Sequence, residues 1–243
     1  MKTQNNTDCY TFKIDKDKDL TLQKPEGVFT PTGTTDVLFR EVRNYLKKPA
    51  KILDLGCGIG VTGLALHQVG LVNEPLYGSD IGQAAVDIFN LNANSHNCKV
   101  IAKCGSVFKP WVNEKFDVII DDISGVAEPV ADVSPWFRGV SCKSGIDGTD
   151  LIIEVLNSAS KHLNENGVLF FPVISFSNVE KIIKVANHNF STVRRLIRKE
   201  WPLPKEMYEH KLILEKLKAD NNSDYSEKFG MIIWYTDIYI AYN

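Results

Sequence analysis

Hydrophobic and polar positions follow two periods along the chain, which predict strands and helices in turn. From residue 51 onward, short and almost continuous apolar runs are followed by segments with apolar residues at helical spacing. The predicted strands are Lys51 to Leu55, Pro75 to Ser79, Lys99 to Lys103, Phe116 to Asp121 and Val168 to Ile174. The predicted helices are Val37 to Leu46, Gly60 to Val69, Gly82 to Asn94, Asp150 to Leu163 and Tyr208 to Lys218. Alternation of this kind is typical of a parallel sheet with helices on both faces.

The two ends of the chain depart from this alternation. Residues 1–24 are polar and charge-rich, and the apolar residues from Tyr10 to Ile14 predict at most one short edge strand. We interpret 1–24 as an N-terminal extension and 25–243 as one domain. The run from Met231 to Tyr242 is rich in Ile, Trp and Tyr, which predicts an antiparallel strand that completes the sheet. The expected fold class is α/β: a doubly wound, mostly parallel, Rossmann-like sheet of seven strands with an antiparallel C-terminal strand.

Composition narrows the classes of partner. The 243 residues are 44% hydrophobic and 24% charged, which suffices for one substantial core. The net charge of -2 provides no global field for a polyanion, so a DNA partner is not expected and a small molecule or protein is favoured over nucleic acid. No apolar run approaches the ~20 residues that cross a bilayer, so we expect a cytoplasmic protein without a membrane partner. The five cysteines lack metal-ligand spacing, and no metal site is expected.

The loop after the first predicted strand carries the strongest chemical signal. From Ile52 to Gly63 the sequence reads ILDLGCGIGVTG, an apolar strand that runs into glycines and then into a helix. Such a loop lets a nucleotide-like ligand approach the amides at the helix N-terminus, whereas the structural alternative is a plain tight turn. Its last six residues also satisfy GxGxxG, the dinucleotide pattern, so the glycines alone do not choose the ligand.

Two acidic residues favour one ligand over the other. Asp54 would repel a pyrophosphate at the strand end, whereas it would stabilise the ammonium of a methionine moiety. It therefore favours S-adenosylmethionine over NAD. Asp80 ends the second strand, where a carboxylate can accept both ribose hydroxyls of an adenosine. Asp80 can also cap the next helix, and the two roles are compatible.

The segment Asp54 to Gly60 resembles motif I of the class I S-adenosylmethionine-dependent methyltransferases. It is similar more narrowly to the small-domain group that includes the release-factor glutamine methyltransferases. The segments that carry this narrower resemblance are Val28 to Pro31, Thr34 to Asp36, Ser79 to Ile81, Asn92 to Asn94 and Ser144 to Thr149. It implies a methyltransferase with S-adenosyl-L-methionine as cofactor. The residues implied to bind it are Asp54, Gly56, Cys57, Gly58, Gly60, Asp80, Ile81, Ser106 and Val107.

The chain departs from this group at the acceptor site. Where the group carries Asn-Pro-Pro-Tyr after the fourth strand, this sequence reads Asp121-Asp122-Ile123-Ser124, so glutamine methylation is not carried over. Asp121, Asp122 and Ser124 become the predicted catalytic residues, because an aspartate there can orient or deprotonate a hydroxyl or ammonium. Which aspartate acts is left open, and the structural alternative is that both merely bond the strand end and loop. Ser106 stands where the group has an acid for the adenine amine.

The remaining predictions concern the acceptor. Pro31, Trp136 and Phe137 are predicted to line the acceptor site, and the alternative for the two aromatic residues is a satellite hydrophobic cluster. The basic stretch from Arg194 to Lys205 can meet an anionic acceptor or form a solvated face. No histidine is given a role. The predicted function is methyl transfer to nitrogen or oxygen on a small molecule or protein. The alternatives are an RNA methyltransferase and a non-catalytic binding protein.

Overall fold

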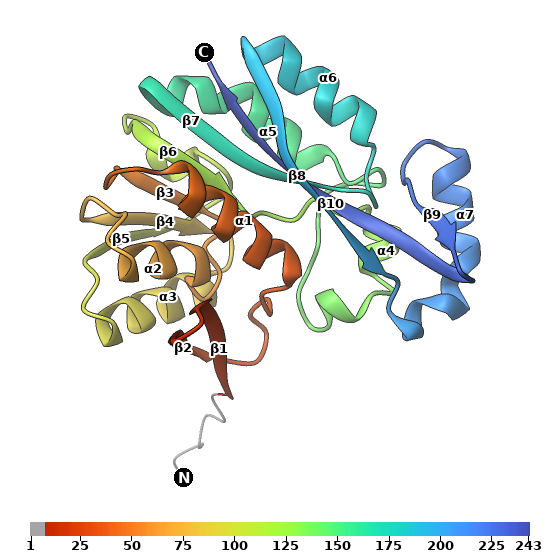
Figure 1. Cartoon of the computed structure of the whole chain (residues 1–243), viewed down its shortest axis with the longest axis horizontal. Coiled ribbons are helices and arrows are strands. Elements are labelled where there is room, and N and C mark those ends of the chain that lie inside the picture. The colour runs from red at the N-terminus through yellow and green to blue at the C-terminus, as the bar shows by residue number, and fades with distance from the viewer. Residues whose placement is uncertain (1–7) are drawn as a thin grey trace.

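A computed structural model describes residues 8–243, and its centre is one large β-sheet (Figure 1). Seven strands run in the order β5-β4-β3-β6-β7-β10-β8, and the short β9 pairs with β10. The strands are β3 Ile52–Leu55, β4 Leu76–Asp80, β5 Val100–Cys104, β6 Phe116–Asp121, β7 Leu163–Ile174, β8 Thr192–Pro202, β9 Ser226–Lys228 and β10 Met231–Tyr242. Strands β3 to β7 pair in parallel, whereas β10 lies antiparallel between β7 and β8. The predicted fold class is confirmed.

Helices cover both faces of this sheet. They are α1 Gly33–Tyr45, α2 Val61–Gln68, α3 Gln83–Ser95, α4 Glu128–Ala131, α5 Asp150–Ser158, α6 Val179–Asn189 and α7 Lys211–Ala219. Single 3-10 turns are η1 Lys109–Trp111, η2 Pro135–Phe137, η3 Ala159–His162 and η4 Lys205–His210. Helix α6 is not among the elements that the sequence predicts, although its buried Ile182 and Ala186 lie at helical spacing.

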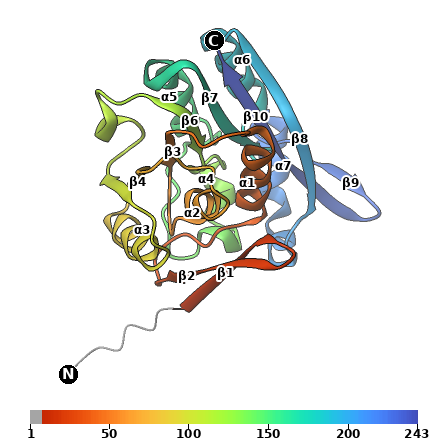
Figure 2. The same ribbon diagram turned by 60° about the vertical axis from the view of Figure 1, so that its left-hand side comes forward.

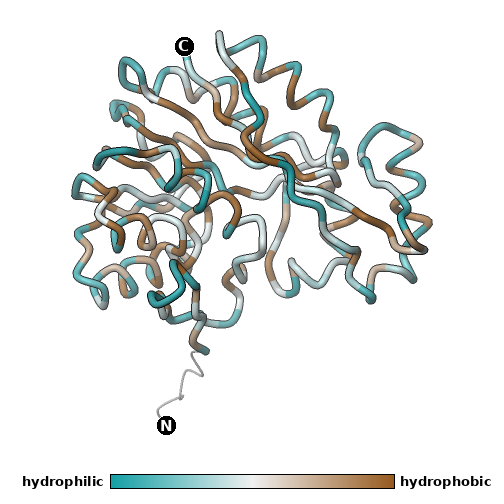
Figure 3. Tube along the Cα trace, viewed as in Figure 1, coloured by the Kyte–Doolittle hydropathy of each residue, from teal (hydrophilic) through white to brown (hydrophobic). Residues whose placement is uncertain are grey.

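Alternating strand residues contribute to two separate hydrophobic layers. In Figure 3 the central strands are mostly brown, whereas the helices alternate between brown and teal. Ile52 and Ile120 belong to the layer beneath α1, α2 and α3. Their neighbours Leu53 and Ile119 belong to the layer beneath α5 and α6. Successive side chains of a strand point to opposite faces, so strands buried on both sides read as continuous apolar runs. This is why the sequence predicts them as buried.

The N-terminal segment differs from its prediction. Instead of one short edge strand, it forms an antiparallel hairpin of β1 Asp8–Asp15 and β2 Lys18–Lys24, which packs beside α2 and α3 (Figure 2). The apolar side chains of both strands are buried, and the Phe12 ring meets Phe39 of α1 edge-on at 5.3 Å between centroids. The outer face of the hairpin is polar, so the segment as a whole is rich in charged residues. This composition makes the alternation of apolar and polar residues along the two strands hard to recognise.

A third hydrophobic cluster lies beyond the sheet edge and is formed by α4, η4, α7 and the start of β10. In Figure 1 it occupies the right-hand part of the molecule. Among residues 8–243 no helix is long and apolar enough to cross a membrane. The cytoplasmic location stays a prediction.

Candidate functional site

A cavity of about 490 Å³ lies at the carboxyl ends of β3, β4 and β6. This edge is where the crossover connections of an open α/β sheet leave room for a ligand. Its charged lining residues are three carboxylates, Asp54, Asp80 and Asp122, and one cation, Lys143. Most of the remaining lining is apolar. The cavity therefore has the size of a nucleoside-containing ligand and a local excess of negative charge.

The glycine loop forms the floor of the cavity. Gly56 has φ +80° and Gly60 has φ +92°, a conformation that favours glycine. A Cβ at Gly56 would lie 2.7 Å from the side chain of Ile123, so a larger residue would clash there. The amides of Gly56 and Cys57 both donate to the carbonyl of Ser79, at 2.8 and 3.0 Å. These bonds hold the loop against the end of β4.

Asp54 is buried at the bottom of this loop. Its Oδ2 accepts a hydrogen bond from the amide of Gly63 at 2.9 Å. The pKa of Asp54 is raised to about 7, mainly by burial and in smaller part by the charges of Asp122 and Asp80, while the hydrogen bond from Gly63 opposes this shift. No cation of the described chain pairs with this carboxylate, so a positively charged ligand group would stabilise its ionised form.

Asp80 holds two parts of the backbone together. One carboxylate oxygen accepts from the amide of Gly58 at 3.1 Å and the other accepts from the amide of Gly82 at 2.8 Å. Gly82 caps the N-terminus of α3, so the capping interpretation of Asp80 describes one of these bonds. Burial raises the pKa of Asp80. Each oxygen keeps a second lone pair, so both can still accept from a ligand in the cavity.

The pleat separates the two predicted catalytic aspartates. Asp122 lines the cavity with Asp54, whereas Asp121 is buried outside the cavity lining, where it accepts a hydrogen bond from the amide of Ile123 at 3.2 Å. Burial raises the pKa of Asp122 to about 6, while a hydrogen bond from Thr35 lowers it. The pKa of Asp121 lies well above its usual value, again through burial. Of the two aspartates, only Asp122 lines the cavity.

The other predicted cofactor residues lie mostly where they are expected. The lining of the cavity includes Asp54, Gly56, Cys57, Gly58, Asp80, Ile81, Ser106 and Val107. Gly60 lies outside this lining. A Cβ at Gly60 would lie 2.4 Å from the ring of Phe89, so this glycine allows the loop to pack against α3.

Some of the residues predicted to lie near the acceptor line the cavity, and one does not. Pro31, Phe137 and Ser124 line the cavity, and the Phe137 ring lies 5.2 Å from that of Phe29 between centroids. Trp136 lies outside the cavity lining and packs at 5.0 Å on Trp234 in the third hydrophobic cluster. The alternative of a satellite cluster therefore describes Trp136, whereas Phe137 both packs against this cluster and lines the cavity.

Three cavity residues were not predicted to act. Thr35 lies in the first turn of α1 and lowers the pKa of Asp122 through a side-chain hydrogen bond, and Phe29 forms an aromatic wall with Phe137. Lys143 supplies the positive charge of the lining. The first two lie within the segments that carry the family resemblance, which was the available signal. Lys143 stands in a loop without any recognisable pattern.

The basic stretch on β8 is partly neutralised. Arg198 donates to both oxygens of Asp237 at 2.7 Å, and Arg195 donates to the same carboxylate at 3.2 Å. Asp237 is fully buried on β10, and its charge raises the pKa of Arg198. The guanidinium of Arg198 also lies 3.5 Å from the centroid of the Tyr235 ring. These contacts tie both arginines to the sheet, which reduces what they offer to an anionic partner.

The segment that contains the glycine loop matches a known protein family. Residues 19–122 match the family model of the methyltransferase small domain. The chain is 26% identical over 174 residues to the ribosomal protein L11 methyltransferase of Staphylococcus saprophyticus, which covers 69% of this chain and 53% of that protein. It is 26% identical over 151 residues to the release factor glutamine methyltransferase of Geobacter sulfurreducens, with 59% and 52% covered. The chain thus spans about half the length of the curated relatives it matches.

Solved structures share the fold. The L11 methylase of Lactobacillus delbrueckii superposes with a TM-score of 0.59 at 14% identity and covers 96% of this chain and all of its own. A 16S rRNA N2 G1207 methyltransferase of T. thermophilus, in complex with AdoMet and guanosine, superposes with a TM-score of 0.62 at 16% identity. It covers 97% of this chain and 50% of its own.

These similarities confirm the predicted resemblance to small-domain methyltransferases. The family model and the named relatives are methyltransferases, which supports the predicted enzyme class. The predicted cofactor is the methyl donor bound in one solved neighbour, which supports that prediction. The acceptors named for these proteins differ, since they include ribosomal and release-factor proteins and RNA.

Proposed function

We propose that this chain is an S-adenosylmethionine-dependent methyltransferase that acts on a nitrogen or oxygen acceptor of a protein or small molecule. The observation that carries the proposal is the convergence of Asp54, Asp80 and Asp122 with a glycine loop in one cavity. Asp54 lies in β3, Asp80 is the last residue of β4, and Asp122 directly follows β6. These three carboxylates suit a ligand with a positive charge and a ribose, bound next to an acceptor group that loses a proton.

The residues present fit this cofactor. The buried Asp54 has no cationic partner in the described chain and suits an ammonium group, while the free lone pairs of Asp80 suit the ribose hydroxyls. Gly58 lines the cavity with no protein atom within 4 Å of where its Cβ would be, so the backbone is open to a close approach. When bound, S-adenosylmethionine supplies an electrophilic methyl group on a sulfonium sulfur.

Asp122 is the residue best placed to receive the proton of the acceptor. It lies on the same face of the sheet as Asp54, at the boundary between the glycine loop and the aromatic wall of Phe29 and Phe137. Its pKa of about 6 leaves it mostly ionised near neutral pH but still able to accept a proton. The side chain of Thr35 lowers the pKa of Asp122 and so favours its ionised form.

The charge of the site supports a protein or small-molecule acceptor over RNA. Three carboxylates against one lysine repel a phosphate backbone near the cavity, and two arginines of the basic stretch are engaged by Asp237. The two relatives described above are named for protein substrates.

The proposed function is tested by incubating the protein with radiolabelled S-adenosylmethionine and cell extract. Label is expected in the protein or small-molecule fraction. Label in RNA alone would support the RNA methyltransferase alternative. If the protein binds the donor in calorimetry but transfers no label to any fraction, the chain is a non-catalytic binding protein.

We expect Asp80→Ala to weaken S-adenosylmethionine binding by roughly 1.5 to 3 kcal/mol, the range for hydrogen bonds to a charged group. The loss combines the ribose contact with the support of the Gly58 amide. Calorimetry measures the affinity, and circular dichroism confirms that the variant is folded. An unchanged affinity would remove Asp80 from the binding site.

We expect donor affinity to rise with pH because Asp54 must be ionised to bind an ammonium group. With a pKa of about 7 in the free protein, Asp54 is mostly protonated at about pH 6 and mostly ionised at about pH 7.5. The affinity should therefore increase about eightfold between these values. In Asp54→Asn the affinity should be low and should lose most of this pH dependence. An equally steep profile in both proteins would assign the titration to another group.

A further inference from the structure

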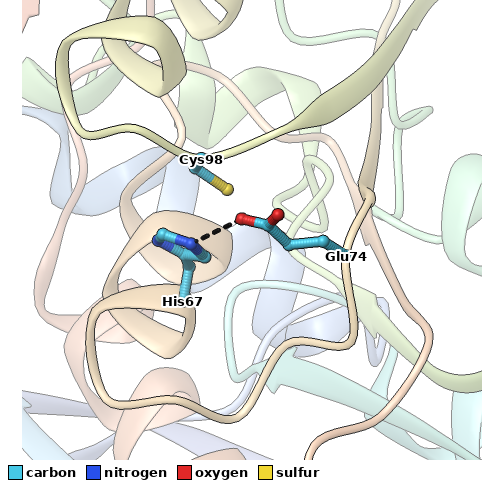
Figure 4. Close-up of side chains that lie close together, drawn as sticks. All are labelled: His67, Glu74 and Cys98. Carbon is cyan, nitrogen blue, oxygen red and sulfur yellow. Dashed lines mark hydrogen bonds and ion pairs between the residues drawn. The ribbon is translucent and has the colours of Figure 1, made fainter.

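Three side chains with metal-binding atoms lie close together (Figure 4), at the end of the strands opposite the cavity. His67 lies in the last turn of α2, Glu74 in the loop before β4, and Cys98 in the loop before β5. These loops precede the amino ends of their strands, whereas the cavity lies at the carboxyl ends. The cluster therefore has no part in the proposed methyl transfer.

The spacing of the three groups suits a small cation. One nitrogen of His67, one carboxylate oxygen of Glu74 and the Sγ of Cys98 all lie within 4.8 Å of one another. The Nε2 of His67 is 2.8 Å from the Oε1 of Glu74. Bond lengths to tetrahedral zinc place its ligand atoms roughly 3.3 to 3.6 Å apart. The separations in the structure therefore exceed these values by at most about 1.5 Å.

Few other protein groups compete for these atoms. The nearest acceptor of the Cys98 thiol is the carbonyl of Lys99 at 3.8 Å, and the Glu74 carboxylate otherwise accepts only a long bond of 3.4 Å from the Lys99 amide. The Nδ1 of His67 is buried and has no hydrogen-bond partner in the described chain. The three side chains are therefore engaged mainly with one another.

We propose that His67, Glu74 and Cys98 form a binding site for Zn²⁺, with a water molecule as the fourth ligand. An imidazole and a thiolate favour zinc over magnesium or calcium, which prefer all-oxygen sites. Burial and, in smaller part, the negative charge of Glu74 raise the pKa of the Cys98 thiol to about 12, so the ion must displace the thiol proton as it binds.

Zinc at this site would cross-link α2 to the loops that precede β4 and β5. The segment between His67 and Cys98 contains β4 with Asp80 and the whole of α3. Since a ligand that binds only the folded state stabilises it, zinc should protect this segment and the domain as a whole. The proposal does not depend on the proposed methyltransferase function.

The test uses full-length protein treated with a chelator and then titrated with Zn²⁺ or Co²⁺. We expect one equivalent of metal per chain, a thiolate-to-cobalt charge-transfer band, and a rise in melting temperature of roughly 5 to 10 °C at about 100-fold excess over Kd. Cys98→Ser should remove the band and weaken zinc binding at least ~100-fold, since even loss of an outer-shell partner costs 10–100-fold.

Two further variants keep the result interpretable. Glu74→Gln changes an exposed side chain, so it should weaken binding without unfolding the protein. Cys9→Ser removes an exposed thiol on β1 outside the cluster and should bind metal like the unaltered chain. Absence of stoichiometric binding, or equal affinities in Cys98→Ser, Glu74→Gln and Cys9→Ser, would overturn the proposal.

Discussion

A valine in place of Gly58 is expected to abolish S-adenosylmethionine binding. Gly58 has φ +51°, and its amide donates to Asp80 at 3.1 Å from the floor of the cavity. A Cβ at this position would meet no protein atom within 4 Å, so a branched side chain would project beside the loop into space that the ligand requires. The conformation also disfavours β-branched residues, which would displace the amide. Calorimetry should show no measurable binding.

Gly230→Val provides a matched control for this substitution. Gly230 has φ +74°, also has no atom within 4 Å of its Cβ position, and lies in the turn between β9 and β10. It carries the same backbone strain without touching the cavity. Donor affinity should be unchanged in this variant. Normal binding by Gly58→Val would mean that the ligand does not lie along the glycine loop.

Replacing Asp122 by asparagine is expected to lower turnover ~100-fold or more while donor affinity stays nearly constant, in the range for loss of a general base. Asparagine keeps the shape and the contact with Thr35 but cannot take a proton from the acceptor. In the unaltered protein, turnover should rise as pH increases through about 6, because Asp122 must be ionised to act as a base. The asparagine variant should lose this dependence. Steady-state kinetics with the acceptor found in the labelling experiment measure both effects.

Asp121→Asn is the natural comparison because it makes the same chemical change one residue earlier. Asp121 lies outside the cavity lining, so its replacement should affect stability more than turnover. Equal and small effects of the two variants on turnover would show that Asp122 does not act on the acceptor. Loss of donor affinity together with turnover in Asp122→Asn would instead give this carboxylate a role in organising the cofactor pocket.

The parts of the site that the sequence predicts consist of residues close to one another along the chain. Asp54 and the glycines belong to one continuous segment, and a parallel strand fixes where such a segment lies in the sheet. The separation of Asp121 from Asp122 follows from the two-residue repeat of a strand. The same reasoning predicts the sheet itself, since strands covered on both faces are apolar at nearly every position.

The parts that escape prediction depend on contacts between distant segments. Asn92 on α3 donates to the carbonyl of Gln23 at 3.0 Å and accepts from its amide at 2.8 Å, which holds the N-terminal hairpin against the domain. Nothing in the polar sequence of the hairpin indicates this partner. Trp136 and Phe137 are adjacent, yet only the folded chain shows that one packs on Trp234 while the other faces the cavity.

The excess of carboxylates over cations in the cavity affects how tightly the product of the proposed reaction is held. In the proposed reaction, methyl transfer converts a sulfonium ion into a neutral thioether, so the ligand keeps its ammonium group but loses one positive charge inside a cavity lined by Asp54, Asp80 and Asp122. A unit charge about 4 Å from a carboxylate gains roughly 1 kcal/mol in water and about 4 kcal/mol at the lower effective dielectric of a protein site. The product that remains after methyl transfer loses this part of the attraction as soon as it forms. The carboxylates therefore attract the product, which keeps its ammonium group, less strongly than the donor, and this difference favours release of the product.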